Sequence, residues 1–505
     1  MVIGAGVGGL VAALELASAG VEVIVLEKAA APGGKIRQVE VDGRRIDAGP
    51  TVFTMRWVFE EIFARAGTSL GEQLRLAPVE TLARHAWSAG EHFDLFADLE
   101  RSVDSIGMLA GAAEAARYRT FCRRAERVYH TLDRSFIRAA APSLSGLIRS
   151  VGLGTDLWGI APFTTLWQAL GDHFHDPRLR QLFGRYATYC GSSPFHAPAT
   201  LMLVAHVERE GVWIIEGGMH RLAAILAGLA AARGASFRYA VTARKIHVEG
   251  GRTASVELDT GERIRADAIV CNADVAAIAA GLLGEDIRGT VAAPRPSQRS
   301  LSAVTFALVA KTWGFPLLHH NVFFSADYAA EFDDLFGRRS LPHAPTVYVC
   351  AQDRDENGRI PSAATERLFC IVNAPPRGDT HSFDASEITQ CEERTFSLLE
   401  RLGLTIQRRP EALQTTTPND FERMFPATGG AIYGASSHGA MAAFRRPGAR
   451  SRLPGLYLAG GSIHPGPGIP MAALSGSMAA ASLLADLAST PRWRPMAISG
   501  GMSTA

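Results

Sequence analysis

The sequence lacks the closely spaced cysteine pairs that form zinc ribbons or redox-active dithiols. Its six cysteines lie far apart, at Cys122, Cys190, Cys271, Cys350, Cys370 and Cys391. Isolated reduced thiols of this kind are usual in cytoplasmic proteins. We therefore expect a cytoplasmic protein without a metal site.

An excess of charge of one sign is also missing. The formal net charge is +1, so the broad basic surface that a nucleic-acid partner requires is not indicated. Charged residues make up 20% of the chain and hydrophobic residues 47%, with a mean hydropathy of +0.07. This composition is apolar for a soluble protein but short of that of an integral membrane protein.

Long uninterrupted apolar runs are scarce. Residues 1–26 are interrupted by Glu15 and Glu22 and have no basic segment before them, so a signal peptide is not expected. Residues 469–487 carry no charge before Asp486, but they are rich in Ala, Gly and Ser. Small residues suit a helix packed inside protein better than one in lipid. We expect no transmembrane helix.

The first thirty residues have the spacing of a dinucleotide-binding unit. A short apolar strand at 2–3 meets glycines, a helix over 10–19 follows, and a second strand over 21–26 ends at Glu27. In such a unit Gly4 allows the tight turn, Gly6 lets the backbone approach a pyrophosphate, and Gly9 lets the helix pack closely. Glu27 can accept hydrogen bonds from ribose hydroxyls. Because strands average about five or six residues, we expect a few residues upstream of the chain.

Three further sequence blocks indicate which dinucleotide is bound. They are Lys28 to Lys35 with its Pro32-Gly33-Gly34, Asp47-Ala48-Gly49-Pro50-Thr51, and the apolar strand that meets Gly460-Gly461 and continues through His464 to Pro470. These blocks resemble the flavin-binding blocks of the amine oxidase and phytoene desaturase superfamily, which implies FAD. The resemblance places Lys35 at the pyrophosphate, Gly460 and Gly461 at the ribityl chain, and the positive end of a helix from Pro470 at the flavin pyrimidine ring.

The cofactor-binding residues that follow from the motif and the resemblance are Gly4, Gly6, Gly9, Glu27, Lys28, Gly34, Lys35, Gly49, Pro50, Thr51, Ala243, Gly460, Gly461, Gly468, Ile469, Pro470 and Met471. Ala243 stands where the family usually has Val. A second glycine-rich nucleotide motif is missing from the sequence. We therefore expect the organic substrate to reduce the flavin, and oxygen or a quinone to reoxidise it.

The rest of the chain resembles the carotenoid/phytoene desaturase family. The blocks that carry the likeness are 176–195, 211–219, 270–274 with Cys271 where the family has Ser, 319–328 and 429–434. Residues 217–222 and 468–474 differ from the usual phytoene desaturase versions. Together with Arg185 to Tyr189, they look more like the enzymes that insert the 3,4 double bond into 1-hydroxy or 1-methoxy carotenoids.

Three alternatives stay open. One is a phytoene or neurosporene desaturase, and another is a flavin amine or protoporphyrinogen-type oxidase, which would need an aromatic cage beside the flavin. The third is a lipid-carrying chaperone of the same fold, against which the intact flavin block at 455–470 argues.

The sequence predicts an α/β protein with a Rossmann-like FAD-binding domain in three parts, residues 1–60, 206–285 and 426–490. Residues 61–205 are predicted to form a helical, membrane-facing insertion, residues 286–425 a mixed-sheet substrate domain, and residues 491–505 a flexible tail. Single strands are expected over 237–249, 253–258 and 264–271, and strands of the substrate sheet over 304–311, 346–351 and 368–374.

The predicted insertion contains a basic amphipathic stretch. Residues 117–149 hold eight arginines interleaved with bulky apolar residues. Such a helix can lie on an anionic bilayer, although a solvated helix face has the same pattern. A carotenoid is insoluble in water, so we expect the enzyme to be cytoplasmic and peripherally bound to the inner membrane, from which it takes its substrate.

Catalysis is predicted to need mainly flavin electronics and positioning. Removing a hydride leaves an allylic cation, which makes the neighbouring proton acidic. The sequence shows no Ser/His/Asp triad and no paired carboxylates. His464 is the titratable residue of the last flavin block and is the candidate proton acceptor, while Tyr433 and His438 are weaker candidates.

Overall fold

The computed structural model describes residues 1–140, 163–292, 294–355, 357–360 and 365–489. The tail predicted at 491–505 lies outside the described residues. At the centre of one half is a five-stranded sheet whose strand pairings are all parallel, in the order β20-β13-β1-β2-β9. Its strands are β1 (Val2–Ile3), β2 (Ile24–Leu26), β9 (Ser236–Arg238), β13 (Ile269–Cys271) and β20 (Leu456–Leu458).

Both faces of this sheet are covered, because successive side chains of a strand point to opposite faces. Val2, Val25 and Val270 pack against helices, whereas their neighbours Ile3, Leu26 and Cys271 face the other side. The helices are α1 (Val7–Ser18), α2 (Arg56–Arg65), α11 (His220–Ala232) and α16 (Ile469–Ser489). The opposite face carries α12 (Val275–Ala279) and an antiparallel sheet of β10 (Ala243–Glu249), β11 (Arg252–Leu258) and β12 (Arg263–Arg265).

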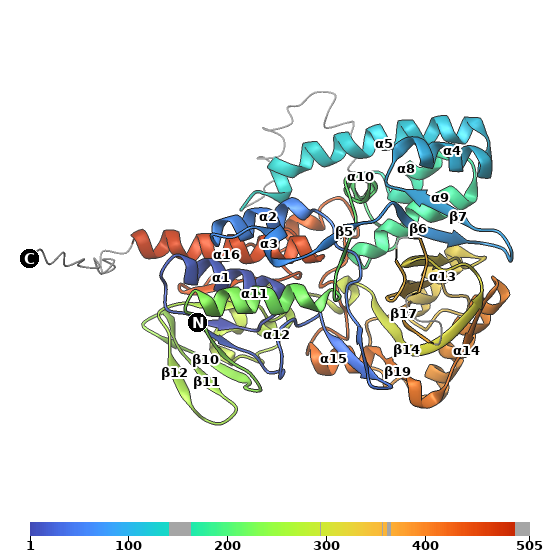
Figure 1. The fold of residues 1–505 in the computed structure, drawn as a ribbon. Helices are drawn as coiled ribbons and strands as arrows, with labels where there is room; N and C mark the ends of the chain where they lie inside the picture. The colour runs from blue at the N-terminus through green and yellow to red at the C-terminus, as the bar shows by residue number, and fades with distance from the viewer. Residues whose placement is uncertain (141–162, 293, 356, 361–364, 490–505) are drawn as a thin grey trace, which may run out of the picture.

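The other half is built on an eight-stranded mixed sheet (Figure 1). Its order is β18 (Leu404–Gln407), β14 (Ser302–Gly314), β17 (Glu366–Ala374), β16 (Val347–Ala351), β15 (His320–Phe323), β6 (Thr81–Ala86) and β7 (Phe93–Phe96), with β19 (Leu413–Thr416) paired to β14. Helix α14 (Ala385–Arg401) packs on one face. The other face is covered by α4 (Leu99–Ala110), α5 (Ala112–Leu132), α8 (Leu166–His173) and α9 (Pro177–Gly184).

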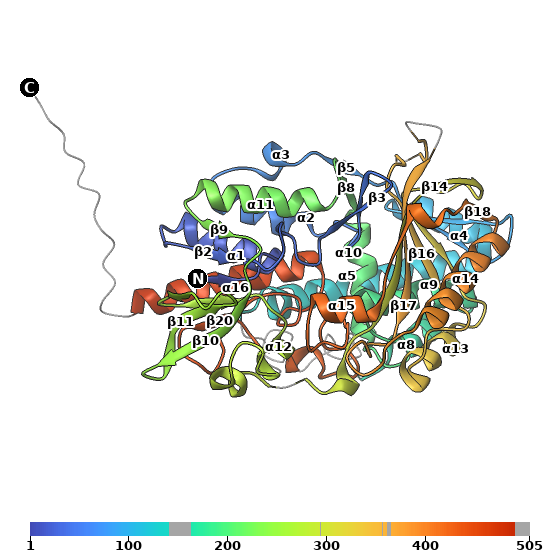
Figure 2. The same ribbon diagram turned by 90° about the horizontal axis from the view of Figure 1, so that it is seen from below.

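The remaining elements are shorter. They are α3 (Leu70–Gln73), α10 (Leu203–Arg209), α13 (Tyr328–Phe332), α15 (Pro418–Met424), the ribbon of β3 (Gln38–Val41) and β4 (Arg44–Asp47), and the ribbon of β5 (Leu76–Pro78) and β8 (Trp213–Ile215). In Figure 2, β3, β5, β8, α10 and α15 lie between the two halves, α3 lies beside α11, and α13 lies beside α14. The predicted α/β class, with a flavoprotein-type domain and a mixed-sheet domain, is confirmed.

Two strand predictions were wrong in the same way. The segment 237–249 is divided between β9 and β10, which belong to different sheets, because Ala240 adopts a left-handed φ of 55° and turns the chain. The segment 264–271 is likewise divided between β12 and β13. Neither segment contains a glycine or a proline that would mark the break. The strands predicted over 304–311, 346–351 and 368–374 correspond to β14, β16 and β17.

The predicted insertion is not only helical. Strands β5, β6 and β7 lie within it, and β6 runs parallel to β15 and extends the eight-stranded sheet. The apolar residues of α5 face inward, where Phe121, Val128 and Leu132 are buried. These side chains are therefore not exposed to a headgroup layer, and peripheral membrane binding stays a prediction. Leu144, Leu147, Ile148 and Arg149 lie outside the described residues.

Among the described helices, α16 is long and apolar enough to cross a bilayer, with a mean hydropathy of 1.4. Its small-residue face nevertheless packs against α1. A Cβ on Gly476 would lie 2.2 Å from the carbonyl oxygen of Gly8, a separation that only glycine permits. The Ala/Gly/Ser content of this segment therefore serves close helix packing, as the sequence indicated.

Candidate active site

The carboxyl ends of parallel strands meet at one edge of the five-stranded sheet, where ligands of open α/β sheets bind. Gly4 follows β1, Glu27 follows β2, Asn272 follows β13 and Gly460 closely follows β20. All four line one cavity. The edge therefore brings together three segments that are hundreds of residues apart in the chain.

Glu27 holds the glycine turn in place. Its Oε2 accepts a hydrogen bond of 2.6 Å from the Ala5 N–H, and its Oε1 accepts one of 2.8 Å from the Ala29 N–H. Gly33 N–H donates in turn to the Ala5 carbonyl at 2.8 Å. The carboxylate thus orders the loop and also lines the cavity. Its remaining lone pairs are available to accept hydrogen bonds from ribose hydroxyls.

Asn272 lies at the centre of the glycine contacts, a role that sequence reasoning did not assign. Built Cβ atoms on Gly6 and Gly8 would lie 2.6 Å from its Nδ2 and 2.8 Å from its Oδ1. Gly460 approaches the same side chain. The signal available in the sequence was the position of Asn272 directly after a short apolar strand.

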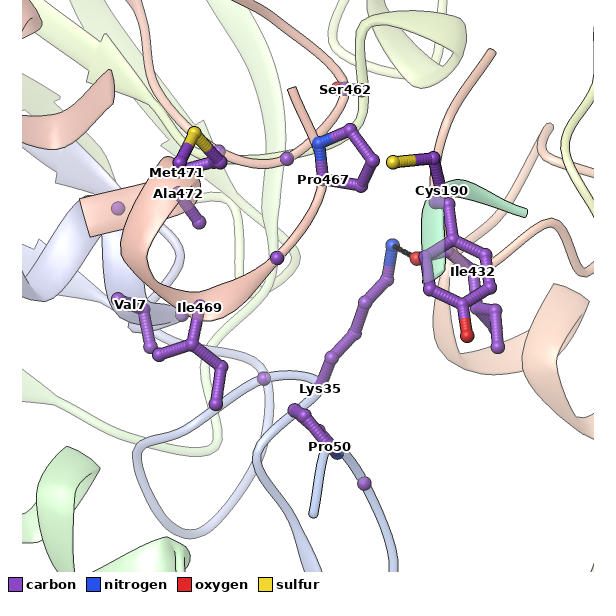
Figure 3. Close-up of a pocket in the computed structure, with 18 of the residues that line it drawn as sticks. Val7, Lys35, Pro50, Cys190, Ile432, Ser462, Pro467, Ile469, Met471 and Ala472 are labelled. Carbon is purple, nitrogen blue, oxygen red and sulfur yellow. Dashed lines mark hydrogen bonds between the residues drawn. The ribbon is translucent and has the colours of Figure 1, made fainter. Parts of the chain in front are cut away.

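The start of α16 faces this edge. Figure 3 shows Ile469, Met471 and Ala472 at the first turn of the helix, beside Val7 of α1. The positive ends of α1 and α16 both adjoin the cavity, an arrangement that favours an anionic or electron-rich ligand. The helix predicted to begin near Pro470 is confirmed.

Lys35 reaches away from the glycine turn. Its Nζ donates a hydrogen bond of 2.8 Å to the carbonyl of Ile432, and it lies 5.1 Å from the ring centroid of Phe425 (Figure 3). Burial lowers the pKa of this amine, an effect that the more distant Asp274 partly offsets. Its pairing with a pyrophosphate stays a prediction.

The cavity has a volume of about 790 Å³ and extends from the sheet edge into the second half of the molecule. It is lined by every predicted cofactor-binding residue except Gly9, whose built Cβ would lie 2.1 Å from the Gly4 carbonyl. Gly9 therefore serves close packing within the turn. The far part of the cavity is largely apolar, with walls formed by Leu132, Phe136, Leu201, Val204, Val207 and Phe444.

One polar group interrupts that apolar wall. Tyr186 and Tyr189, from the short 3-10 helix Arg185–Cys190, each donate a hydrogen bond of 2.7 Å to the carboxylate of Glu208 on α10. Arg185 Nη1 donates to Tyr189 Oη at 3.1 Å. Burial raises the pKa of Glu208, against the effect of the phenols and of Arg185. Burial opposes the charge of Arg185, but Tyr189 and Glu208 outweigh it and raise the pKa of the guanidinium.

Of the three predicted catalytic side chains, all within the described part of the chain, one lines the cavity and two do not. His464 does not line it. This side chain is 1% exposed, and its Nε2 donates a hydrogen bond of 2.8 Å to the Ala139 carbonyl. Tyr433 lines the cavity, and burial raises its pKa to about 12. His438 Nε2 accepts from the Ser193 N–H at 3.0 Å. Proton transfer by His464 stays a prediction.

Acid should destabilise the fold through His464. Burial lowers its pKa to about 4, whereas the unfolded value is about 6.5. The unfolded state therefore binds more protons between these values, and the free energy of unfolding falls as the pH drops from about 6.5 to about 4. We expect this group to contribute roughly 3 kcal/mol to that fall. Urea unfolding at several pH values should show a flatter profile for His464→Gln, and equal profiles would contradict the assignment.

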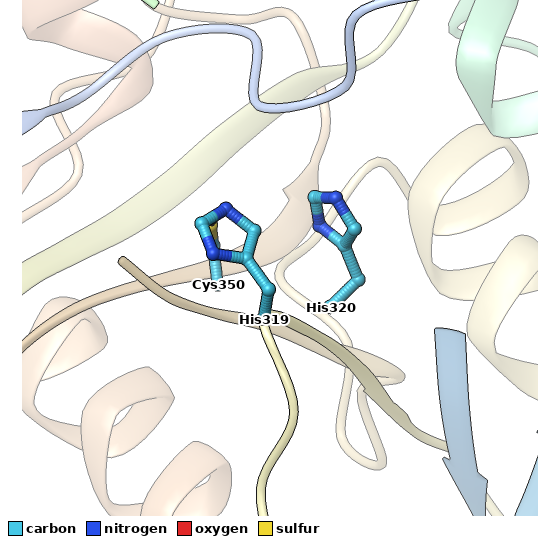
Figure 4. Close-up of side chains that lie close together, drawn as sticks. All are labelled: His319, His320 and Cys350. Carbon is cyan, nitrogen blue, oxygen red and sulfur yellow. Dashed lines mark hydrogen bonds between the residues drawn. The ribbon is translucent and has the colours of Figure 1, made fainter. Parts of the chain in front are cut away.

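One group of described side chains has the composition of a metal site. The ligand atoms of His319, His320 and Cys350 lie within 4.8 Å of one another (Figure 4). Two of them contact each other, with Cys350 Sγ 3.5 Å from His319 Nε2, and the third contacts a neighbour, with His320 Nδ1 2.7 Å from Tyr348 Oη. The prediction of no metal site stays open to metal analysis of the purified protein.

The edge of the five-stranded sheet has the features of a dinucleotide-binding site, and it opens into a large apolar cavity. This combination is typical of a flavoprotein oxidoreductase that acts on an apolar substrate. The chain belongs to the flavin containing amine oxidoreductase family, whose model matches residues 7–484. It is therefore an FAD-dependent oxidoreductase.

Relatives match the chain over its whole length. It is 54% identical to a hydroxyneurosporene desaturase of Rubrivivax gelatinosus, covering 100% of this chain and 96% of the relative. It is 45% identical to a hydroxyneurosporene desaturase of Cereibacter sphaeroides, covering 97% and 98%. Among solved structures, an oxidoreductase from Methanosarcina mazei shares the fold with a TM-score of 0.59 at 16% identity, covering 94% of this chain and 98% of the other.

Proposed function

We propose that this enzyme inserts the 3,4 double bond into a 1-hydroxy or 1-methoxy carotenoid during carotenoid biosynthesis. The observation that carries the proposal is a single cavity that is lined both by the carboxyl ends of the parallel strands and by apolar side chains of α5 and α10. The full-length relatives named hydroxyneurosporene desaturases support the substrate class. Phytoene or neurosporene desaturation remains the alternative within the same chemistry.

The residues of the sheet edge fit FAD. The bare backbone of Gly4, Gly6 and Gly8, with Asn272 behind it, leaves room for phosphates at the start of α1. We expect Glu27 to bind the ribose and the first turn of α16 to adjoin the flavin ring. When bound, FAD supplies the acceptor for the electron pair that leaves the substrate.

The chain's own contribution to the reaction is positioning and exclusion of water. The cavity walls formed by α5, α10 and Phe444 are apolar, so they suit a polyene. They also exclude water from the reacting carbons. The lost proton leaves a carbon that is already acidified by its allylic neighbour, so a weak acceptor is sufficient. For reoxidation we propose oxygen or a quinone.

Product analysis tests the function directly. Neurosporene, lycopene and their 1-hydroxy forms are offered in liposomes to the FAD-loaded enzyme, and the products are separated by chromatography. We expect one further double bond in the hydroxylated substrates. Preferential conversion of neurosporene over the hydroxylated forms would contradict the proposal and support the alternative within the same chemistry.

FAD should be held without a covalent bond. Cys190 lines the cavity and lies near Pro467 (Figure 3), but burial raises the pKa of its thiol. Because the thiolate is the nucleophile, a raised pKa disfavours attachment. Acid precipitation should therefore release all the flavin into the supernatant, from wild type and Cys190→Ala alike. Yellow colour retained in the wild-type pellet alone would show a cysteine linkage.

We propose that the enzyme binds peripherally to anionic membranes through exposed arginines of α5. Arg119 pairs with Glu100, and Arg124 contacts His173 at 3.1 Å, so Arg123 and Arg127 are the exposed members. Arginines near an anionic surface contribute about 1 kcal/mol each, and this share falls with ionic strength.

Changing Arg123 and Arg127 to Glu should weaken sedimentation with anionic liposomes at least about tenfold at low salt. Bound FAD should not change. The matched control reverses Arg252 and Arg265, which are exposed on the small β10–β12 sheet. Equal sedimentation of both variants and wild type would show that the exposed arginines of α5 form only a solvated helix face and do not bind the membrane.

A further inference from the structure

A second pair of polar side chains adjoins Arg185 in the cavity wall. Tyr348 of β16 and Thr51 line the cavity beside Arg185, and Tyr348 Oη lies 2.8 Å from Thr51 Oγ1. The guanidinium carbon of Arg185 lies 5.2 Å from the ring centroid of Tyr189 and 5.6 Å from that of Tyr348. We name Arg185, Tyr189, Glu208, Tyr348 and Thr51 the Arg185 cluster.

The cluster has unused donors that face the cavity. Burying an ion pair without full hydrogen bonding is costly, so the free groups of such a cluster point to a polar ligand. Among the described residues, Arg185 makes one hydrogen bond, although a guanidinium has five N–H groups. Tyr189 donates its proton to Glu208 and accepts from Arg185, which leaves one lone pair on its oxygen.

The position of the cluster is set by the cofactor edge. Thr51 directly follows Gly49 and Pro50 of a predicted flavin-binding block, and Tyr348 is held against Thr51. On the other side, His320 Nδ1 lies 2.7 Å from Tyr348 Oη. These contacts fix a donor-rich patch beside a predicted flavin-binding block.

We propose that the Arg185 cluster recognises the oxygen on C-1 of an acyclic carotenoid and so selects oxygenated substrates over hydrocarbons. Arg185 donates to the hydroxyl or ether oxygen, and a substrate hydroxyl donates to the free lone pair of Tyr189. This inference rests on the proposed function. The oxygen is only a few bonds from the 3,4 position, so its recognition group must adjoin the reacting edge, as this cluster does.

The structure offers a matched pair of variants for the test. Tyr186 and Tyr189 share the 3-10 helix and the Glu208 partner, with equal distances of 2.7 Å, but only Tyr189 lines the cavity. Tyr189→Phe and Tyr186→Phe therefore each remove one phenol hydrogen bond to Glu208, and Tyr189→Phe also removes the acceptor of Arg185. Arg185→Lys keeps the charge that faces Glu208 but loses the planar fork of donors.

Two readouts are measured for 1-hydroxyneurosporene and neurosporene. The first is the kcat/KM ratio of the two substrates, and the second is their equilibrium partition from liposomes to anaerobic protein. We expect the preference for the hydroxylated form to fall about fivefold in Tyr189→Phe and on the order of 30-fold in Arg185→Lys, with no change in Tyr186→Phe.

The outcomes separate the two proposals. An FAD-loaded wild type that converts neither carotenoid contradicts the proposed function itself, and the inference falls with it. A wild type that converts both without preference, or variants that lower both substrates equally, overturns the inference alone. Tyr186 does not line the cavity, so an equal loss of preference in Tyr186→Phe would show a general structural effect instead of contact with the substrate, and it also overturns the inference. If Tyr189→Phe lacks FAD, Arg185→Lys decides.

Discussion

Replacing Gly6 with valine is expected to weaken FAD binding on the order of 100-fold or more while leaving the protein folded. Gly6 has an ordinary φ of −72°, so valine meets no backbone strain. A Cβ there would instead lie 2.6 Å from Nδ2 of Asn272, in the wall that faces the cofactor. Overpacking of this kind costs about 1–3 kcal/mol, and the branched side chain also occupies space that the pyrophosphate needs.

The measurement is the FAD stoichiometry of the purified variant and its Kd from flavin fluorescence, with circular dichroism as the check on folding. The clash involves the end of a flexible side chain, which can move without disrupting the sheet. Gly228→Val is the control, because a Cβ at this exposed position of α11 meets nothing within 4 Å. Full retention of FAD by folded Gly6→Val protein would remove the phosphate-site assignment.

Replacing Gly476 with alanine is expected to destabilise the protein by roughly 2 kcal/mol and to release FAD. In a helix, alanine is favoured over glycine by about 1 kcal/mol. At this position the gain is outweighed, because the Cβ would lie 2.2 Å from the carbonyl oxygen of Gly8, a backbone atom that cannot rotate away. Helix α16 must then move off α1 and carry Ile469 to Met471 with it.

The same substitution at Gly228 is expected to change the free energy of unfolding in the opposite direction. Gly228→Ala meets no atom within 4 Å and should stabilise the protein by up to about 1 kcal/mol through helix propensity. Urea unfolding of both variants, with and without FAD, gives the two changes in free energy. A Gly476→Ala protein as stable as wild type would show that the contact between α1 and α16 is loose and does not position the flavin end.

The local motifs could be predicted from the sequence because their geometry spans few residues. The turn from β1 into α1, the acid after β2 and the helix from Ile469 each follow from neighbouring residues, and they also lead to FAD and to the family. The breaks at Ala240 and between β12 and β13 were missed, because neither segment contains a glycine or a proline to mark where the chain leaves one sheet for another.

The sequence by itself thus determined the class of the enzyme, the cofactor and the residues of the glycine turn. Only the tertiary structure decided which face of α5 is buried, that Asn272 fills the space behind Gly6, and that Arg185, Glu208 and Tyr348 meet beside Thr51. The physical reason is the range of the contacts. Hydrogen bonds such as that between Thr51 and Tyr348, which are 297 positions apart, depend on how separate sheets pack, and no local pattern encodes that packing.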